Sequence, residues 1–459
     1  MTAAAVSPAI APGPPGLPLL GNLLAFRRDA LELALRASRT FGDVVRFRLG
    51  PRIVHLVNHP DYVSHVLQHN QKNYLRSARS ASTIALVCGD SLLTSTGAAW
   101  LRQRRLVQPA FHPGGLPGFV PLMTEATQQM LGRWHEHAGN GLQLGVDREM
   151  SRLTLNIVAR TMFGAGVSGD GETVGAAMDV LLEGTFRRIG RVVNLPLWVP
   201  TPGNRRFRRA RGSLDRVVYR MIDERRRQPD GSADLLTRLL RASDNETGSG
   251  MNGDQLRDQT ITLLLSGHET TANALSWALH LVSTHGEVEN RLRAELDSVL
   301  GGRNPVADDL PKLLYTSMVL YEAMRLYPPI WILERYAAED DDIGGYRIPA
   351  HSTVVVSPFT LHRHKAFWPS PDEFVPERFA DVSVVERQPT AFLPFGAGPH
   401  HCVGSHFALL EARVVLAMVV QAFQLRPLPG HVVKPRAEIT LRFRNGLQMM
   451  AHPIRERAL

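Results

Sequence analysis

The stretch Phe395-Gly396-Ala397-Gly398-Pro399-His400-His401-Cys402-Val403-Gly404 decides how the rest of the chain is interpreted. It places Cys402 between glycine-rich turns and a long apolar helical pattern at Phe407–Phe423. Backbone N–H groups and the positive end of a helix dipole favour the thiolate form of a cysteine in such a position. A thiolate in a shielded loop is a soft ligand that can bind haem iron axially.

The composition is that of a folded protein with an arginine-rich surface. The chain has 459 residues, of which 44% are hydrophobic, and its formal net charge is +9. Only four lysines occur, so arginine carries almost all of the positive charge. A basic surface predicts an acidic partner, although a solvated face has the same composition. The two cysteines, Cys88 and Cys402, exclude a disulfide-rich scaffold and fit a reducing compartment.

The N-terminal region carries no membrane signal. The apolar stretch Leu17–Leu24 is interrupted by Pro18, Gly21 and Asn22, which makes it too short for a membrane span or a secretory signal. We therefore expect a soluble cytoplasmic protein without a membrane span. We expect residues 1–14 to be a flexible segment, and residues 15–459 to form a single domain because no long linker divides them.

The hydrophobic pattern is mostly helical. A β-hairpin is predicted at Val44–Leu49 and Ile53–Val57, and further short strands at Ser352–Val356 and near Leu441–Gln448. Helices are predicted at Trp100–Val107, Leu122–His135, Met150–Phe163, Val174–Ile189, Arg205–Arg227, Asp254–Thr284, Leu313–Leu326 and Phe407–Phe423. The sequence therefore predicts a mainly α fold with small β-sheets.

The predicted helix Asp254–Thr284 is apolar on nearly every face, yet it contains Ser266-Gly267-His268-Glu269-Thr270-Thr271. Glycine and β-branched threonine are poor helix formers, and hydroxyls can bond the carbonyl one turn back. One interpretation is a locally distorted core helix with a satisfied Glu269. The other is a helix opened to admit oxygen and water, in which Glu269 and Thr270 relay protons. A buried acid beside a hydroxyl favours the second.

Two pairs of side chains are weaker signals of a functional site. Glu322 and Arg325 lie one helical turn apart among apolar neighbours, and Arg378 offers a further partner. Trp100 and Arg104 share one helix face, where packing with a cation–π contact is the ordinary interpretation. An indole N–H and a guanidinium could instead bind two carboxylates.

Together these motifs resemble the cytochrome P-450 haem-thiolate monooxygenases, from about Pro14 to about Met450. Four motifs stand in the order of that family, and the cysteine loop is the most specific of them. They are Trp100…Arg104, Gly267-His268-Glu269-Thr270-Thr271, Glu322…Arg325 with Pro376-Glu377-Arg378-Phe379, and Phe395–Gly404. The resemblance implies the fold of that family, with a long central helix over the haem.

The resemblance also implies a role for each motif. Cys402 resembles the iron ligand, Phe395 would pack beside its sulfur, and Gly398 and Gly404 would permit the turn. The residues that resemble contacts to the haem propionates are Trp100, Arg104, Arg335 and His400. Those that resemble the oxygen-activating pair are Glu269 and Thr270. Those that resemble a structural triad are Glu322, Arg325 and Arg378.

The implied reaction is hydroxylation or epoxidation of a hydrophobic small molecule, such as a terpenoid, fatty acid or polyketide. The implied cofactor is haem b, without bound flavin or NAD(P). Because the chain ends at Leu459 without a flavin or ferredoxin module, electrons are expected from a separate ferredoxin or flavodoxin and its reductase. Arg102, Arg105 and Arg413 are candidate contacts for that carrier. The candidate substrate contacts are Ser266, Gly267, Thr271, Ile330, Trp331, Ile332 and Leu333.

Two positions depart from the family pattern. His400 stands where arginine is most common, and a neutral histidine would bind a propionate less strongly, so haem retention would depend on pH. Ser266 stands where alanine or glycine is usual. Its hydroxyl could bind water or substrate, but we expect it to bond its own helix backbone.

Other interpretations remain open. A zinc site could use His400, His401, Cys402 and His406, but no second ligand pair completes a tetrahedron. Gly164–Gly169 matches a dinucleotide fingerprint without the strand that should precede it. The basic run Arg205–Arg211 is expected to be a helix surface, so no nucleic-acid partner is expected. Within the haem-thiolate class the alternative is a peroxide-driven peroxygenase or an isomerase. A non-catalytic haem sensor is a third possibility, from a different class of function.

Overall fold

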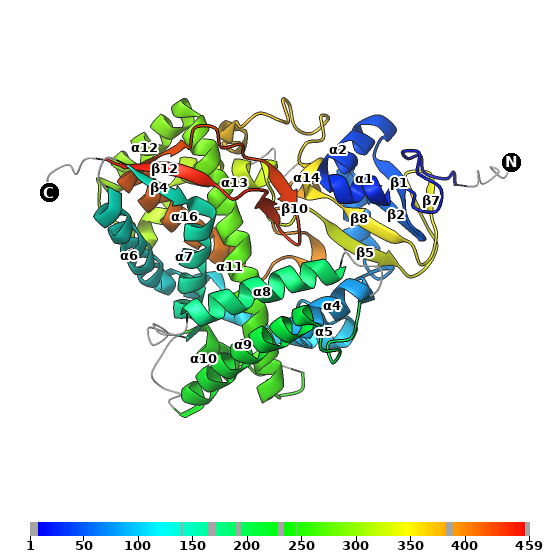
Figure 1. The fold of residues 1–459 in the computed structure, drawn as a ribbon, viewed down its shortest axis with the longest axis horizontal. Helices are drawn as coiled ribbons and strands as arrows, with labels where there is room; N and C mark the ends of the chain where they lie inside the picture. The colour runs from blue at the N-terminus through cyan, green and yellow to red at the C-terminus, as the bar shows by residue number, and fades with distance from the viewer. Residues whose placement is uncertain are drawn as a thin grey trace. The chain divides into compact units, whose positions relative to one another are not determined.

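The computed structural model describes residues 8–138, 141–163, 171–189, 194–227, 234–244, 246–381 and 389–454. The chain forms two compact units, each assembled from two separate stretches (Figure 1). The first unit comprises Met1–Ser77 and Tyr321–Cys402, and the second comprises Ala78–Leu320 and Val403–Leu459. The single domain expected for residues 15–459 stays a prediction.

The first unit is organised around a five-stranded sheet in the order β1-β2-β8-β5-β3. The predicted hairpin is confirmed, because β1 (Val44–Leu49) and β2 (Arg52–Val57) pair antiparallel. The next strand, β8 (Thr353–Val356), runs parallel to β2, and β5 (Leu333–Ala337) pairs antiparallel with β8. Apolar side chains of β1, β2 and β8 alternate between two core clusters, which fixes this register.

Short elements surround this sheet. They are α1 (Leu23–Arg28), α2 (Ala30–Phe41), α3 (Pro60–Ser64), a π-helical turn (His65–His69), β3 (Tyr74–Leu75), β6 (Asp341–Ile343), β7 (Tyr346–Ile348), α14 (Pro358–Leu361) and 3₁₀ turns at Pro376–Phe379, Pro389–Ala391 and Gly398–His400. Helix α13 (Leu314–Leu326) begins in the second unit and ends in the first.

The N-terminal segment is anchored over part of its length. The Ala9 N–H donates to Gly345 O at 3.0 Å, the Arg46 N–H donates to Pro12 O at 2.8 Å, and Ala11 is buried. The flexibility that we expected for residues 1–14 therefore does not extend over residues 9–12. Residues 1–7 lie outside the described part of the chain.

The second unit is mainly helical, as predicted. Its helices are α4 (Ala78–Cys88), α5 (Gly97–Val107), α6 (Val120–Ala138), α7 (Val146–Phe163), α8 (Gly171–Ile189), α9 (Pro202–Arg227), α10 (Leu235–Arg241), α11 (Gly253–Thr284), α12 (Gly286–Leu300) and α16 (Ser405–Ala422), with 3₁₀ turns at Gln108–Phe111, Pro113–Gly115, Pro117–Phe119 and Ala307–Lys312. A three-stranded sheet, β4-β12-β9, and a hairpin, β10-β11, complete it. The strands are β4 (Leu142–Gly145), β9 (Phe423–Pro427), β10 (Pro435–Ala437), β11 (Leu441–Phe443) and β12 (Gln448–Pro453).

Helix α11 is the central element of the second unit. Asn252 caps it by accepting from the Gln255 N–H, and the Gln255 side chain accepts from the Asn252 N–H in return. Two reciprocal bonds of this kind satisfy backbone donors that a helix start leaves unpaired. The helix then runs without interruption to Thr284, and most of its side chains are buried.

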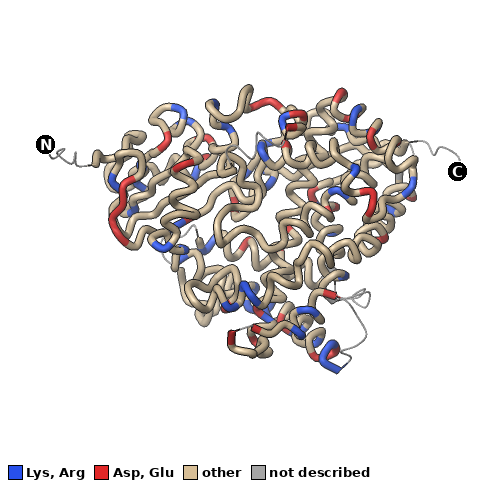
Figure 2. The backbone as a smooth tube through the Cα atoms, turned by 180° about the vertical axis from the view of Figure 1, so that it is seen from behind, with Lys and Arg blue, Asp and Glu red and all other residues tan. Residues whose placement is uncertain are grey.

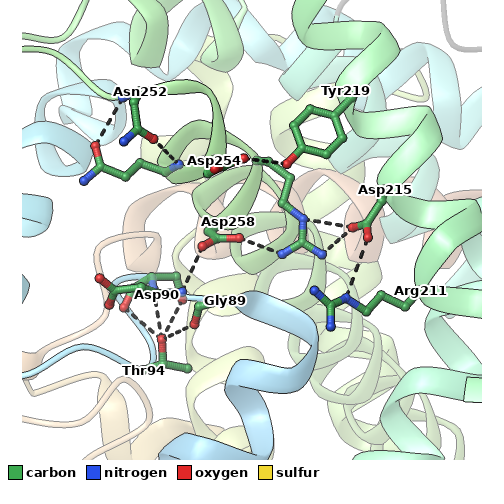
Figure 3. Close-up of polar contacts among 12 residues, drawn as sticks. Gly89, Asp90, Thr94, Arg211, Asp215, Tyr219, Asn252, Asp254 and Asp258 are labelled. Atoms are coloured by element: carbon green, nitrogen blue, oxygen red, sulfur yellow. Dashed lines mark hydrogen bonds and ion pairs between the residues drawn. The ribbon is translucent and has the colours of Figure 1, made fainter. Parts of the chain in front are cut away.

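Polar contacts fix the first turns of α11 to its neighbours (Figure 3). Arg257 donates to Asp215 of α9 at 2.9 Å and to Asp258 at 2.6 Å. Asp258 in turn accepts from the Asp90 N–H at 2.8 Å, just after α4. Gly89 has a φ of +57°, and a Cβ there would lie 2.1 Å from the Asp258 carboxylate. Only glycine lets α4 end this close to α11.

One helix, α16, is by length and hydropathy able to cross a membrane, among the residues that the structure describes. In its 18-residue window, 61% of the residues are buried inside the fold. Core helices of folded proteins share this composition.

Candidate active site

The cysteine loop of the first unit has the shape that its glycines allow. The Cys402 N–H donates to Phe395 O at 3.0 Å, which closes the loop. Gly396 and Gly398 have φ values of +74° and +68°. A Cβ at Gly398 would lie 2.1 Å from the Leu67 carbonyl oxygen, so no larger residue fits there. The loop therefore presents Cys402 as an exposed thiol that forms no disulfide.

An arginine that sequence reasoning missed lies beside this loop. Arg76 Nη2 is 3.1 Å from His400 Nδ1. Arg76 follows the two-residue strand β3, where no local pattern marks it as functional. It brings a permanent positive charge to the position where His400 replaces the more common arginine.

Arg335 of β5 carries a positive charge that no ion pair neutralises among the described residues. Its side chain is half-buried, and its Nη1 donates to the Glu334 carbonyl at 2.9 Å. Within the described residues it forms no salt bridge with a carboxylate. Burial lowers the pKa of the Arg335 guanidinium, and the Glu334 charge offsets this only in part. A half-buried guanidinium of this kind is well suited to an anionic ligand.

Glu322, Arg325 and Arg378 lie together in the first unit. Arg325 makes a two-pronged ion pair with Glu322, with distances of 2.6 and 2.8 Å. Arg378 Nε donates to the same carboxylate at 3.2 Å. The remaining N–H groups of Arg325 reach the carbonyls of His362, Pro371 and Glu373 at 2.7–2.9 Å. Every donor of a fully buried arginine is thus satisfied, as a structural cluster requires.

Two polar side chains in the middle of α11 are accessible to solvent. Ser266 is exposed and Thr270 is partly exposed, although most neighbouring residues are buried. Ser266 Oγ donates to Thr262 O at 2.7 Å, which confirms that Ser266 bonds its own helix. Thr270 Oγ1 likewise donates to Ser266 O at 2.6 Å. The distortion of the helix that we expected here is absent. The two hydroxyls bond carbonyls of the same helix, and α11 stays continuous through this stretch.

Glu269 is a buried carboxylate with two donors from the C-terminal part of the chain. Thr440 Oγ1 donates to Glu269 Oε1 at 2.5 Å, and Arg442 Nε forms an ion pair with the same oxygen. Asn273, one turn along α11, donates to Thr440 Oγ1 at 3.2 Å. Burial alone would lower the pKa of Arg442, but the charge and hydrogen bond of Glu269 raise it. Glu269 is therefore satisfied, as the plainer of the two sequence interpretations predicts.

The other candidates on α11 face a neighbouring helix. A Cβ on Gly267 would lie 3.1 Å from Val158 of α7, so its small size serves helix packing. Thr271 is buried. In the first unit, Trp331 is buried, while Ile332 and Leu333 pack against the two core clusters. Ile330, just before them, is partly exposed.

On α5, Trp100 is buried, and Arg104 Nε donates to Gln108 at 3.0 Å. Arg105 binds Asp244 at 2.8 Å and Glu246 at 2.9 Å. The Arg105 hydrogen bond lowers the pKa of Asp244 to about 2. The contact of Arg105 with a redox carrier is thus unsupported, because its guanidinium is occupied within its own unit.

Arg102 and Arg413 are also less available than the sequence implied. Arg102 Nη2 donates to Ser249 Oγ at 3.1 Å and to Gly250 O at 2.9 Å. Arg413 is partly buried on α16. Neither of them offers an open cationic surface to a carrier.

The zinc interpretation finds no support in the part of the chain that the structure describes. No three His, Cys, Asp or Glu side chains gather there as a metal site. Gly164–Gly169, with the dinucleotide-like pattern, lies outside the described residues.

The comparison with known families decides the assignment. The cytochrome P450 family model matches residues 11–448. The chain belongs to the cytochrome P450 family. The family resemblance, the mainly α fold and the assignment as a monooxygenase, an oxidoreductase, are therefore confirmed.

Several named P450 enzymes are similar over most of their length. Cyclooctatin synthase of Streptomyces melanosporofaciens is 37% identical, covering 94% of this chain and 93% of that protein. Cyclooctat-9-en-7-ol 5-monooxygenase of the same organism is also 37% identical, covering 91% and 90%. Pentalenene oxygenase of Streptomyces avermitilis is 34% identical, covering 93% and 94%.

Membership of the P450 family implies haem b, and the residues present fit this cofactor. Cys402 is an exposed thiol, outside any disulfide, in a loop whose glycines adopt positive φ. Arg335 is a cation without a carboxylate among the described residues, and Arg76 supplements His400. Iron requires a soft anionic ligand, and the two propionates require cationic side chains.

Proposed function

We propose that this P450 hydroxylates or epoxidises a hydrophobic cyclic terpenoid, using O2 and two electrons from a separate carrier. The carrier would be a ferredoxin or flavodoxin with its reductase, and the site of action the cytoplasm. The terpenoid class is supported by relatives named for cyclooctatin, cyclooctat-9-en-7-ol and pentalenene. Fatty acids and polyketides are the alternative substrates. No nucleic acid, bound flavin or bound NAD(P) takes part.

The observation that carries this proposal is the exposed Cys402 thiol, in a loop whose turn at Gly398 leaves no room for a larger residue. Cys402 would bind the iron and Phe395 would shield the sulfur, and Gly404 directly precedes helix α16. The propionates would be held by Trp100, Arg104, Arg335 and His400, with Arg76 as an addition. Glu322, Arg325 and Arg378 would keep the first unit in shape rather than react.

When bound, the haem supplies oxygen binding and one-electron chemistry. Thr270 and Glu269 would relay protons. Because Thr270 already donates its proton to Ser266 O, its lone pairs remain available to accept a hydrogen bond from water. Glu269 accepts from Thr440 and Arg442. Glu269 can transfer a proton only after a water molecule replaces one of these two donors as its hydrogen-bond partner.

The proposed substrate contacts in the second unit are Ser266, Gly267 and Thr271 of α11. Those in the first unit are Ile330, Trp331, Ile332 and Leu333. Most of these side chains are apolar, which favours a hydrocarbon guest over a charged one.

The test begins with the carbon monoxide spectrum of the reduced protein. A thiolate ligand gives a strongly red-shifted band, and Cys402→Ser should abolish it while leaving the fold intact. Cys88→Ser is the matched control, because Cys88 is buried and its pKa is raised by burial to about 11. An unchanged spectrum in Cys402→Ser would refute the ligand assignment.

The reaction type is tested by supplying either electrons or peroxide. Spectral titration with cyclic terpenoids, fatty acids and polyketides identifies a binding class, and turnover is then followed with a surrogate ferredoxin and reductase. Product formed with peroxide alone, and never with the redox chain, would support the peroxygenase alternative. Binding without any turnover would support the haem sensor.

A further inference from the structure

We propose that Asp341 of β6 is a positioning residue for the cysteine loop. Its carboxylate holds two segments of the chain, the π-helical turn His65–His69 and strand β3, and both lead to contacts with the loop. All of these residues lie in the first unit. This role rests on the proposed function, in which Cys402 binds the haem iron.

Asp341 differs from the acidic residues around it in being largely buried. The run Glu339–Asp342 is acidic at four consecutive positions and forms a continuous red stretch of the tube in Figure 2. Acidic side chains ordinarily face solvent, and Glu339, Asp340 and Asp342 are exposed. The Asp341 side chain, in contrast, is only 17% exposed. A carboxylate is stable in such a place only where hydrogen-bond donors compensate its charge.

Three side chains converge on one oxygen of this carboxylate. His65 Nε2 lies 2.8 Å from Asp341 Oδ2, and Asn70 Nδ2 donates to the same atom at 3.0 Å. The Tyr74 hydroxyl donates there at 2.6 Å, and the Asp342 N–H donates to the other oxygen at 2.8 Å. Burial would raise the pKa of the Asp341 carboxyl, but the hydrogen bonds of Tyr74 and His65 lower it. An asparagine would offer one acceptor oxygen and would turn N–H groups toward these donors.

The first segment that Asp341 holds is the π-helical turn. Asp341 binds its first residue, His65, and Asn70, which directly follows its last. The Asn70 N–H donates to His65 O at 2.8 Å, and the two residues are five apart, the spacing of a π-helical bond. Such turns are rare and short, so the bonds to Asp341 support this one. Its Leu67 carbonyl is the group that a Cβ on Gly398 would meet at 2.1 Å, so the cysteine loop packs directly on the turn.

The second segment is β3. Tyr74 is buried and donates to Asp341, and Arg76 follows two residues later. Arg76 Nη2 is 3.1 Å from Nδ1 of His400, which belongs to the cysteine loop. The bond between Tyr74 and Asp341 thus fixes the position from which Arg76 reaches the loop.

Apolar packing joins the two segments to the loop. The core cluster that contains Leu67 and Tyr74 also contains Ile343 of β6. It further contains Leu393, just before the cysteine loop, and Ala397 of the loop packs against it. Because protein interiors are close-packed, they transmit small displacements. A shift of the π-helical turn would therefore move the loop that carries the thiol.

A positioning role can be separated from a purely structural one. Groups around a metal ligand orient it, and they tune the reduction potential of the metal. If Asp341 only stabilised the fold, its loss would lower the free energy of unfolding and nothing else. If it positions Cys402, its loss would also change the spectrum and the reduction potential of the protein that remains folded.

The experiment compares Asp341→Asn with Asp342→Asn in the haem-loaded protein. Both remove one charge from β6, but Asp342 is exposed, and an asparagine there can still accept from the Gly345 N–H. We expect Asp341→Asn to lose part of the red-shifted carbon monoxide band and to shift the reduction potential. It should release haem to an acceptor protein about 10-fold faster than the parent, and the control less than about twofold faster.

Tyr74→Phe is a milder variant that keeps the charge of Asp341 and removes only one hydroxyl. It tests the second segment alone, and it serves if Asp341→Asn does not fold. We expect a partial loss of the red-shifted band, and haem release about threefold faster than in the parent.

Two results would overturn the positioning role alone. One is a parent protein with the red-shifted band whose band and reduction potential are the same in Asp341→Asn, whatever the loss of stability in urea. The other is an equal change in Asp342→Asn. If Asp341→Asn does not fold, an unchanged band in Tyr74→Phe overturns the role. A parent without the band, or Cys402→Ser that keeps it, would refute the ligand assignment as well.

Discussion

Arg442 of β11 and Glu269 of α11 form an ion pair that joins positions 173 residues apart. Thr440 adds a second donor to the same carboxylate oxygen, and Trp277 stacks on Phe443 two turns further along α11. Glu269, Asn273 and Trp277 are spaced four residues apart, so one face of α11 receives residues 440–443, which include β11. The acid proposed for proton delivery is thus also a structural contact.

Arg442→Met should destabilise the protein, because it leaves the Glu269 carboxylate buried with only Thr440 as donor. A broken buried pair costs about 3–5 kcal/mol, but the Arg442 side chain is 35% exposed. After allowing for solvent screening, we therefore expect the free energy of unfolding, measured in urea, to fall by about 1–2 kcal/mol. Adding Glu269→Gln should recover part of the loss.

The control for Arg442 is Arg436→Met on β10, whose pair with Glu438 is more exposed. It should cost less than about 0.5 kcal/mol. An equal loss in both variants would show that the hairpin, and not the Glu269 pair, determines the effect.

Glu322→Gln should be more damaging than Arg442→Met. Glu322 and Arg325 are both fully buried, and Arg378 depends on the same carboxylate. Removing the charge leaves two guanidinium groups without an anion, which should cost about 3–5 kcal/mol and lower the haem content. Urea unfolding and the haem-to-protein absorbance ratio measure this.

The matched control is Glu373→Gln. Glu373 is exposed, and its carbonyl, not its carboxylate, accepts from Arg325. Stability should stay within about 0.5 kcal/mol of the parent. A large loss here would mean that the loop charge matters more than the buried cluster.

Gly398→Ala and Gly396→Ala should differ, although both glycines have positive φ. At Gly396 nothing lies within 4 Å of an added Cβ, so only the left-handed backbone is penalised, by about 1–2 kcal/mol. At Gly398 the Cβ would also collide with the Leu67 carbonyl. An overpacked site adds about 1–3 kcal/mol. If the two variants lost the same stability and the same share of the red-shifted carbon monoxide band, the predicted collision at Gly398 would be contradicted.

His362 predicts a pH dependence. Its Nε2 accepts from the Leu393 N–H at 2.8 Å, just before the cysteine loop, so the ring must be neutral in the fold. Burial, with the charge of Arg325, lowers the pKa of His362 to about 3. The unfolded chain binds a proton below about pH 6.5 and the folded one does not. Stability should therefore fall as pH drops from 6.5 toward 3, by about 1.4 kcal/mol per unit from this group.

His362→Gln keeps an acceptor for Leu393 but cannot titrate, so it should flatten this part of the stability curve. The control is His351→Gln on the surface. Urea unfolding at several pH values measures both. Parallel curves for the parent and His362→Gln would show that other groups, such as His55 and His280, cause the dependence.

The sequence predicted those helices and strands whose formation depends on residues close together in the chain. The β1–β2 hairpin follows from alternation around Gly50-Pro51, and α9 and α11 follow from their apolar periodicity. Helices α2 and α12 were not predicted, since their charged residues interrupt the apolar pattern; tertiary packing of Leu31 and Leu292 completes them.

Contacts between distant segments could not be predicted. Nothing near Arg76 points to His400, and nothing near Arg442 points to Glu269. The helix opening was predicted from poor helix formers, but Ser266 and Thr270 bond carbonyls without breaking the ladder. The orientation of Gly267 toward Val158 depends on α7, whose position no pattern in α11 encodes.

Each of the two units combines an early segment with a late one. On the ribosome, residues 1–77 emerge first, yet Tyr321–Cys402 must follow before the β1-β2-β8-β5-β3 sheet can close. At roughly 5–20 residues per second, synthesis of the intervening segment takes about 10–50 s. During that interval β2 has an unpaired edge, a state that invites aggregation. Neither unit has all of its segments before translation is nearly complete, so we expect haem insertion to be a late event.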